Sequence, residues 1–268
     1  MTGNGRIALA FHALFTAFIA APLVIVCVVA FTPLGYISLP TEGLSLRWFA
    51  AIADNPRFIS AFWLSLLLGV VSSLVSTALA VPAALALARF RFRGRDAISA
   101  FLLSPLMIPH VVLGVAFLRF FSQIGINGTF AGLAIAHVIV ILPFALRLVL
   151  AAVTGMDPAV ERAAVSLGAP RFTVFRRVTL PLILPGIVSG WLLAFITSFD
   201  ELTMSVFVAN PSTTTLPVRM FLQIQDTIDP MVAAVSALLI AATVVVMLVL
   251  DRLVGLERLF VGQGRHRG

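Results

Sequence analysis

Apolar residues gather into six long stretches along this chain, and the segments between them carry most of the charged residues. A helix needs about 20 apolar residues to cross the hydrocarbon core of a bilayer, and each stretch is long enough. We therefore expect an all-α integral membrane protein in which a single transmembrane domain spans residues 1–268. Its six transmembrane helices are expected near residues 7–31, 60–88, 97–121, 129–152, 182–209 and 231–250.

The composition supports the same class of protein. Hydrophobic residues make up 60% of the chain and charged residues 11%, whereas a soluble globular domain has about 25% charged residues. Too few polar side chains remain to cover a water-soluble surface. The net charge of +7 needs no nucleic-acid partner, because arginines beside the spans serve to orient them in the lipid. The single cysteine, Cys27, excludes an internal disulfide and a cysteine-based metal site.

The distribution of arginines between the connecting segments indicates the orientation of the spans. Connections on the cytoplasmic side of a membrane carry an excess of basic residues. The segments after spans two, four and six each hold four arginines, namely Arg89, Arg91, Arg93 and Arg95, then Arg162, Arg171, Arg176 and Arg177, then Arg252, Arg258, Arg265 and Arg267. The connections after spans one, three and five hold fewer. Both termini are therefore expected in the cytoplasm.

The segment between spans four and five predicts a short cytoplasmic helix at residues 158–168. Asp157 and Pro158 form a strong helix start, because an aspartate can cap the helix and proline fits its first position. Gly168 suits the left-handed residue that closes a helix. Small and apolar residues between them share one face, which fits either a groove on another protein or a layer of lipid headgroups.

The same segment resembles a known motif, the "EAA" loop in the membrane-spanning subunits of bacterial binding-protein-dependent ABC importers. The residues that match its spacing are Ala163, Ala164, Gly168, Val178, Leu180 and Pro181. The chain departs from the motif at one position, since Arg162 stands where the family has glutamate and Glu161 comes one residue earlier. Residues 198–221, SFDELTMSVFVANPSTTTLPVRMF, are similar to the end of span five in polyamine-type permeases.

The resemblance implies a type I importer of the bacterial inner membrane, with two permease subunits, two cytoplasmic ATPases and a periplasmic capture protein. The second permease would be a paralogue of this chain, since polyamine-type relatives usually pair two different permeases, or alternatively a second copy of this chain. The short helix would be the coupling helix that docks on the ATPase, through Glu161, Arg162, Ala163, Ala164, Leu167, Gly168 and Ala169. The chain lacks the phosphate-binding loop of such ATPases and has no lysine. We therefore expect no enzyme activity and no cofactor in this chain, and ATP hydrolysis by a partner.

Two acids near the end of span five are the candidate contacts for cargo. An acid deep in a bilayer costs roughly 2.5–3.5 kcal/mol, so such groups tend to face a cavity or a partner. On a continuous helix Asp200 shares one face with Thr197, Thr203 and Met204, and Glu201 lies on the next face. These residues would form a polar strip along a translocation path. Alternatively, the acids pair with an arginine and only mark the outer end of the span.

The cargo expected from these acids and from the resemblance is a small organic cation, with putrescine or spermidine first. Fixed carboxylates attract ammonium groups, whereas anionic cargo would favour arginines. Related permeases also serve ferric iron, sulfate, phosphonates and opine-like solutes, and an ion-coupled carrier without ATPases is a further alternative. His110 and His137 are expected to hydrogen-bond to a neighbouring helix, and neither has partners at metal-ligand spacing.

Overall fold

The structure is a computed structural model, and it describes residues 3–39 and 41–254. Every regular element in these ranges is a helix, as the sequence predicted. Five of the described helices are long and apolar enough to cross a membrane, or six if a pair bent by 99° counts as one broken span. The chain divides into two compact units, one made of residues 1–59 and 220–268 and the other of residues 60–219.

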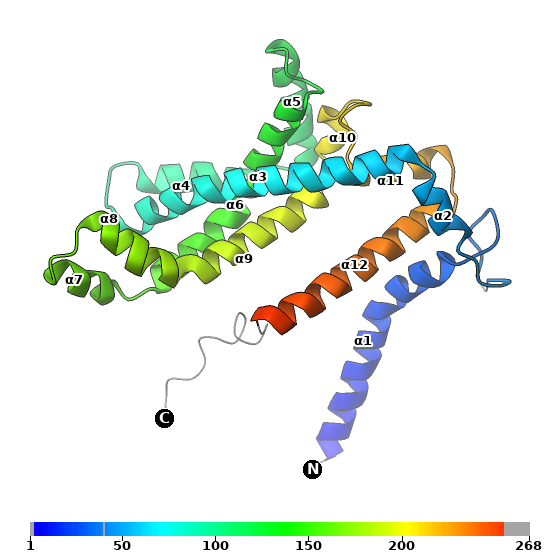
Figure 1. Ribbon diagram of the computed structural model, residues 1–268, viewed down its shortest axis with the longest axis horizontal. Helices are drawn as coiled ribbons and strands as arrows, with labels where there is room; N and C mark the ends of the chain where they lie inside the picture. Colours follow the sequence, from blue (N-terminus) through cyan, green and yellow to red (C-terminus); the bar gives the residue numbers. More distant parts are fainter. Residues whose placement is uncertain (1–2, 40, 255–268) are drawn as a thin grey trace. The chain divides into compact units, whose positions relative to one another are not determined.

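The first unit contains the helices from the two ends of the chain. The C-terminal end of α1 (Gly3–Val29) packs against the N-terminal end of α12 (Met231–Val254), and the short helix α2 (Arg47–Ala53) lies against α12 (Figure 1). Trp48 of α2 is buried in this small core. Its indole nitrogen donates to the carbonyl oxygen of Leu34 at 3.2 Å, which ties the loop after α1 to α2.

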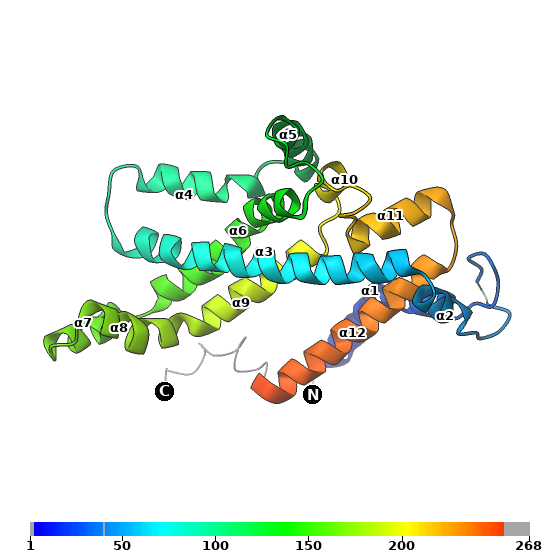
Figure 2. The same ribbon diagram turned by 45° about the horizontal axis from the view of Figure 1, so that its top comes forward.

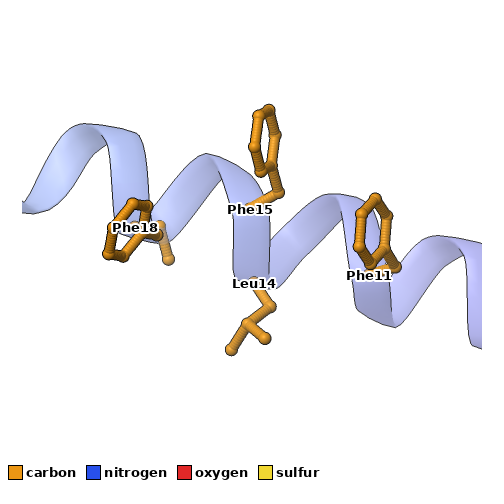
Figure 3. A pocket seen from close by; sticks show the side chains of 5 residues that line it. Phe11, Leu14, Phe15 and Phe18 are labelled. Carbon is orange, nitrogen blue, oxygen red and sulfur yellow. The ribbon is translucent and has the colours of Figure 1, made fainter.

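Most side chains of α1 are exposed within this chain, as suits a helix in contact with lipid. Its aromatic residues form a shallow groove on the helix surface, which Figure 3 shows from close by. The lining side chains are Phe11, Leu14, Phe15, Ala17 and Phe18. All five are apolar and all come from this one helix, so the groove is a feature of an apolar helix surface rather than an enclosed site.

The second unit is built around α6 (Phe130–Gly155). Buried side chains of α6, such as Leu133, Val140 and Val149, form the centre of its core, and α9 (Leu180–Phe199) packs along α6 (Figure 2). The remaining helices of this unit are α4 (Arg95–Leu103), η1 (Ser104–Leu106), α5 (His110–Gln123), α7 (Pro158–Ser166), α8 (Arg171–Val174), η2 (Phe175–Thr179) and α10 (Ser205–Val208). Two helices, α3 (Pro56–Arg89) and α11 (Leu216–Asp226), contribute residues to both units.

The third expected span, residues 97–121, is broken in the structure. Its first part consists of α4 and η1, and its second part is α5. The two parts meet at a bend of 99° between Leu106 and His110. Pro105 and Pro109 are the physical reason, because neither has an N–H to continue a helix. Pro109 has an extended backbone, with φ −55° and ψ 133°, and α5 begins directly after it.

The fifth expected span, residues 182–209, also differs from the structure. Its helix begins earlier, since α8, the π-helical turn η2 and α9 follow one another without a gap from Arg171. It ends earlier too, at Phe199, and the chain is not helical again until α10 begins at Ser205. The helical face that was expected to carry Asp200, Thr203 and Met204 therefore does not form.

The cytoplasmic position of both termini stays a prediction. Three of the arginines on which it rests, Arg258, Arg265 and Arg267, lie outside the described residues. The assignment of the whole chain to a single permease domain likewise stays a prediction.

Candidate functional site

A nearly fully buried carboxylate organises the segment between α9 and α10. Glu201 is only 6% exposed. Its Oε1 accepts the backbone N–H of Met204 at 2.7 Å, and its Oε2 lies 2.8 Å from Nδ1 of His110 at the start of α5. Because an ionised carboxylate can only accept hydrogen bonds, Nδ1 of His110 is the donor. Both oxygens of Glu201 are therefore engaged by the chain itself, and the local bond to Met204 replaces the helical hydrogen bonding that ends at Phe199.

A second histidine joins the two sides of the same segment. His137 of α6 is fully buried. Its Nδ1 lies 2.8 Å from Oγ of Ser198, in the last turn of α9, and its Nε2 lies 2.9 Å from Oγ of Ser205, the first residue of α10. A serine hydroxyl can donate or accept, so either neutral tautomer of His137 is satisfied. The prediction of a hydrogen bond to a neighbouring helix is confirmed for His137, while His110 bonds to the segment between two helices.

Helix α5 rests directly on this segment at Gly114. A Cβ atom added there would lie 3.2 Å from both Cα and the carbonyl oxygen of Met204, and 2.7 Å from a ring carbon of Phe207. Only a residue without a side chain allows α5 to approach the backbone so closely. The segment of residues 200–204, which we call the α9–α10 break, is thus held by α5 on one side and by α6 through His137.

The residues predicted to share a cargo path lie in different surroundings at this break. Asp200 and Thr203 are exposed, Thr197 is half-buried, and Met204 belongs to the hydrophobic core. The hydroxyl of Thr197 donates to the carbonyl oxygen of Leu193 at 2.8 Å, so it is already used within α9. Glu201 pairs with a histidine and not with an arginine, which was the alternative partner expected from the sequence.

The short helix between α6 and α8 has the two ends that the sequence predicted. At its start, Oδ1 of Asp157 accepts the N–H of Ala159 at 2.8 Å, and Pro158 is the first helical residue. At its end, Gly168 has a φ of 84°, in the left-handed region. The N–H of Gly168 donates to Val165 at 2.9 Å and the N–H of Ala169 donates to Ala164 at 3.1 Å, the pair of bonds that defines a Schellman motif.

Helix α7 has no buried residue, and its side chains divide into an outward and an inward set. Arg162, Ala163 and Leu167 are exposed, Leu167 by 89%, while Ala164 and Ala169 are half-buried. Glu161 is directed inward. Its carboxylate forms an ion pair with Arg89, the last residue of α3, and accepts a hydrogen bond from the hydroxyl of Thr179 in η2. Thr179 was not singled out from the sequence, since a threonine beside a predicted span gives no signal of its own.

Acidic and histidine side chains do not gather into a metal centre in the described part of the chain. No group of three His, Cys, Asp or Glu residues there could hold a metal ion.

The arrangement of helices is similar to that of chains in solved ABC transporters. A crystal structure of a bacterial ABC transporter that imports the acidic polysaccharide alginate matches it with a TM-score of 0.76, covering 93% of this chain and 96% of that chain at 16% identity. A second structure, of the alginate transporter in complex with an alginate-bound periplasmic protein, matches with a TM-score of 0.67, covering 93% and 94% of the two chains at 19% identity. At these identities the likeness concerns the fold.

The chain belongs to the family described as binding-protein-dependent transport system inner membrane component, whose model matches residues 80–256. It is 33% identical to the spermidine/putrescine transport system permease protein PotC of Haemophilus influenzae, over 91% of this chain and 95% of that protein. It is 32% identical to the putrescine transport system permease protein PotI of Escherichia coli, over 85% and 84%. It is also 27% identical to the sulfate transport system permease protein CysT of Salmonella typhimurium, over 89% and 92%.

The chain is therefore a permease subunit of an ABC importer and a multi-pass protein of the bacterial inner membrane. Permease subunits of this family are not themselves enzymes. The relatives differ in the cargo that they are named for, so family membership alone leaves both polyamines and sulfate as candidates.

Proposed function

We propose that this chain forms the translocation path of an ATP-driven polyamine importer, with putrescine or spermidine as the cargo. The observation that carries the cargo class is the 33% identity to a spermidine/putrescine permease over 91% of the chain. The 32% identity to a putrescine permease supports the same class. The sulfate permease is a more distant match at 27%, and the acidic side chains at the α9–α10 break are poorly suited to an anion.

Asp200 is the residue that we assign to the cationic cargo. Its side chain is exposed at the end of α9, whereas both oxygens of the neighbouring Glu201 are engaged by Met204 and His110. A carboxylate and an ammonium group 4 Å apart attract each other by about 4 kcal/mol at an effective dielectric constant near 20. Asp200 can therefore hold an amine transiently without a rearrangement of the break.

The other predicted path residues have supporting roles in this proposal. Thr203 is exposed beside Asp200 and offers a hydroxyl to the same path, and Thr197 lies on the last turns of α9. Met204 and Glu201 are buried, so in this proposal they stabilise the segment that carries the exposed residues and do not contact cargo themselves. Asp200 is thus the carboxylate that is free to meet cargo, and Glu201 holds it in position.

Helix α7 is the coupling helix in this proposal, and it lies on the cytoplasmic side together with both termini. An exposed leucine near the exposed Ala163 suits a surface that another protein covers, and Leu167 is 89% exposed in this chain. The partners are a pair of ATPases, a second permease that is a paralogue of this chain, and a periplasmic capture protein. A periplasmic protein is part of one solved structure with this fold, which supports the last of these partners.

Uptake by the assembled importer tests the proposal. Proteoliposomes that contain this chain with its ATPases, second permease and capture protein are expected to take up labelled putrescine or spermidine only when ATP is supplied. Replacement Asp200→Asn removes the charge and keeps the size, and we expect it to raise the KM for the polyamine by about 5–30-fold, equivalent to about 1–2 kcal/mol. Asp226→Asn, at an exposed aspartate that ends α11, is the matched control and should leave KM unchanged.

Three results would contradict the proposal. ATP-dependent uptake of sulfate without uptake of polyamines would assign the anionic cargo of the more distant relative. Uptake by this chain alone, without ATPases, would make it an autonomous carrier. An unchanged KM in Asp200→Asn would remove Asp200 from the path.

A further inference from the structure

One carboxylate of α7, that of Glu161, links this helix to other elements of its unit in addition to the two connecting loops. None of its residues is buried, so packing alone holds it weakly. Glu161 differs from the exposed residues of α7, because its side chain is only 14% exposed. One carboxylate oxygen pairs with Arg89 and the other accepts from Thr179. A single side chain of α7 therefore reaches two elements that are far apart in the sequence.

The two partners of Glu161 lie at the ends of two long helices. Arg89 is the last residue of α3, so a displacement of its guanidinium acts on the end of that helix. Thr179 is buried and is the last residue of the π-helical turn η2, directly before α9. Figure 2 shows α7, α8 and the start of α9 in succession at one end of the unit, where η2 joins α8 to α9.

The π-helical turn gives the start of α9 a distinct geometry. The N–H of Leu180 donates to the carbonyl oxygen of Phe175, five residues earlier, instead of four. Pro181 follows and has no N–H, so the carbonyl oxygen of Arg177 loses the partner that an α-helix would give it. Wide turns of this kind are common at functional sites in helices. Thr179 thus connects Glu161 to the π-helical turn at the start of α9.

We propose that Glu161 is a positioning residue that carries a displacement of α7 to α3 and α9 at the same time. The inference rests on the proposed function of α7 as the coupling helix. When an ATPase moves α7, the ion pair with Arg89 transmits the displacement to the end of α3. The hydrogen bond from Thr179 transmits it to the start of α9. Arg162, the next residue in the sequence, is exposed and takes no part in these two contacts.

Transport and ATP hydrolysis, measured together in the assembled importer, test this role. Glu161→Gln removes the negative charge at nearly constant size, and Arg89→Gln removes the positive charge with a shorter side chain. Arg91→Gln and Arg93→Gln, at exposed arginines just after α3, are the controls. We expect the first two to lower the amount of cargo moved per ATP by about five-fold or more, with the ATPases still bound and hydrolysing. The controls should keep the wild-type ratio. The exchange Glu161→Arg with Arg89→Glu restores the ion pair and should recover most of the coupling.

A second measurement separates this inference from the proposed function. Trypsin cleaves after arginine, and two exposed arginines lie here, Arg162 within α7 and Arg171 at the start of α8. In inverted membrane vesicles we expect faster cleavage at both sites in Glu161→Gln than in Arg91→Gln, whether or not the importer moves polyamines. Equal cleavage rates, or a wild-type ratio of cargo to ATP in Glu161→Gln, overturns the inference. A wild-type importer that moves no cargo contradicts the proposed function instead.

Discussion

Asp200 and Glu201 are neighbours in the sequence, yet their side chains have opposite surroundings. Glu201 is 6% exposed and accepts from Met204 and His110, whereas Asp200 is exposed at the end of α9. A buried carboxylate must be paired, because an unpaired one carries a large desolvation cost. The pair with His110 satisfies that requirement, so Glu201 is a part of the scaffold, and we propose Asp200 as the carboxylate that meets the cargo.

Removal of Glu201 is expected to destabilise the protein rather than to weaken cargo binding directly. Glu201→Ala leaves the N–H of Met204 and the ring of His110 without their acceptor, which should cost about 2–4 kcal/mol. Glu201→Gln keeps an acceptor for Met204 and should cost about 1 kcal/mol. Thermal unfolding in detergent measures both.

A double-mutant cycle shows whether the loss comes from the pair. Glu201→Ala and His110→Ala, singly and together, should give a coupling energy of about 1–2 kcal/mol. A coupling energy near zero would mean that the two side chains do not stabilise each other. A raised KM for polyamines in Glu201→Gln without any loss of stability would place Glu201 in the cargo path after all.

At the scale of elements, α7 is the best example of a helix determined by local chemistry. Asp157 caps its first turn, Pro158 fits its first position, and Gly168 closes it in a Schellman motif. All three act through their own neighbours in the sequence, which is why the pattern predicted both ends closely. The left-handed backbone of Gly168, φ 84°, costs an ordinary residue roughly 1–2 kcal/mol.

Substitutions at Gly168 are expected to act through this backbone conformation. A Cβ atom there meets nothing within 4 Å, so space within the chain is not limiting. Asparagine tolerates the left-handed region better than other residues, and β-branched valine is among the worst. We expect transport by Gly168→Asn to be reduced about two-fold and by Gly168→Val about ten-fold, in the order of these backbone energies. Uptake by the assembled importer, normalised to the amount in the membrane, measures this.

A different order would point to another cause. If Gly168→Asn and Gly168→Val fail equally while both proteins remain stable, the obstacle is the side chain itself against a docked partner. If neither substitution changes transport, the end of α7 is unimportant for coupling.

At the scale of the whole molecule, the orientation of the chain rests on the distribution of its arginines. The cytoplasmic side is expected to carry α7 and the segment that follows α3, and the opposite side is expected to carry the end of α5. Two exposed serines, Ser166 at the end of α7 and Ser122 in the last turn of α5, are convenient positions for a test.

Single cysteines at these serines should be accessible from opposite sides of the membrane. With Cys27 replaced by alanine, a membrane-impermeant maleimide should label Ser122→Cys in intact spheroplasts and Ser166→Cys only in inverted vesicles. Labelling of both positions from the same side would contradict the predicted orientation. The two positions serve as controls for each other, because both are exposed serines on helices.

The sequence alone determined that this chain is an all-helical membrane protein, where most of its helices lie and how α7 begins and ends. These properties depend on hydrophobicity, on proline and glycine, and on residues a few positions apart. Pro105 and Pro109 interrupt the third span through their own missing N–H groups, whereas the close approach of α5 to the α9–α10 break at Gly114 depends on the tertiary structure. Only the tertiary structure decided which acid is buried, because the partners of Glu201 and Glu161 include His110 and Arg89, which are distant in the sequence. The role of each carboxylate depends on the charged groups and hydrogen-bond donors that folding places next to it.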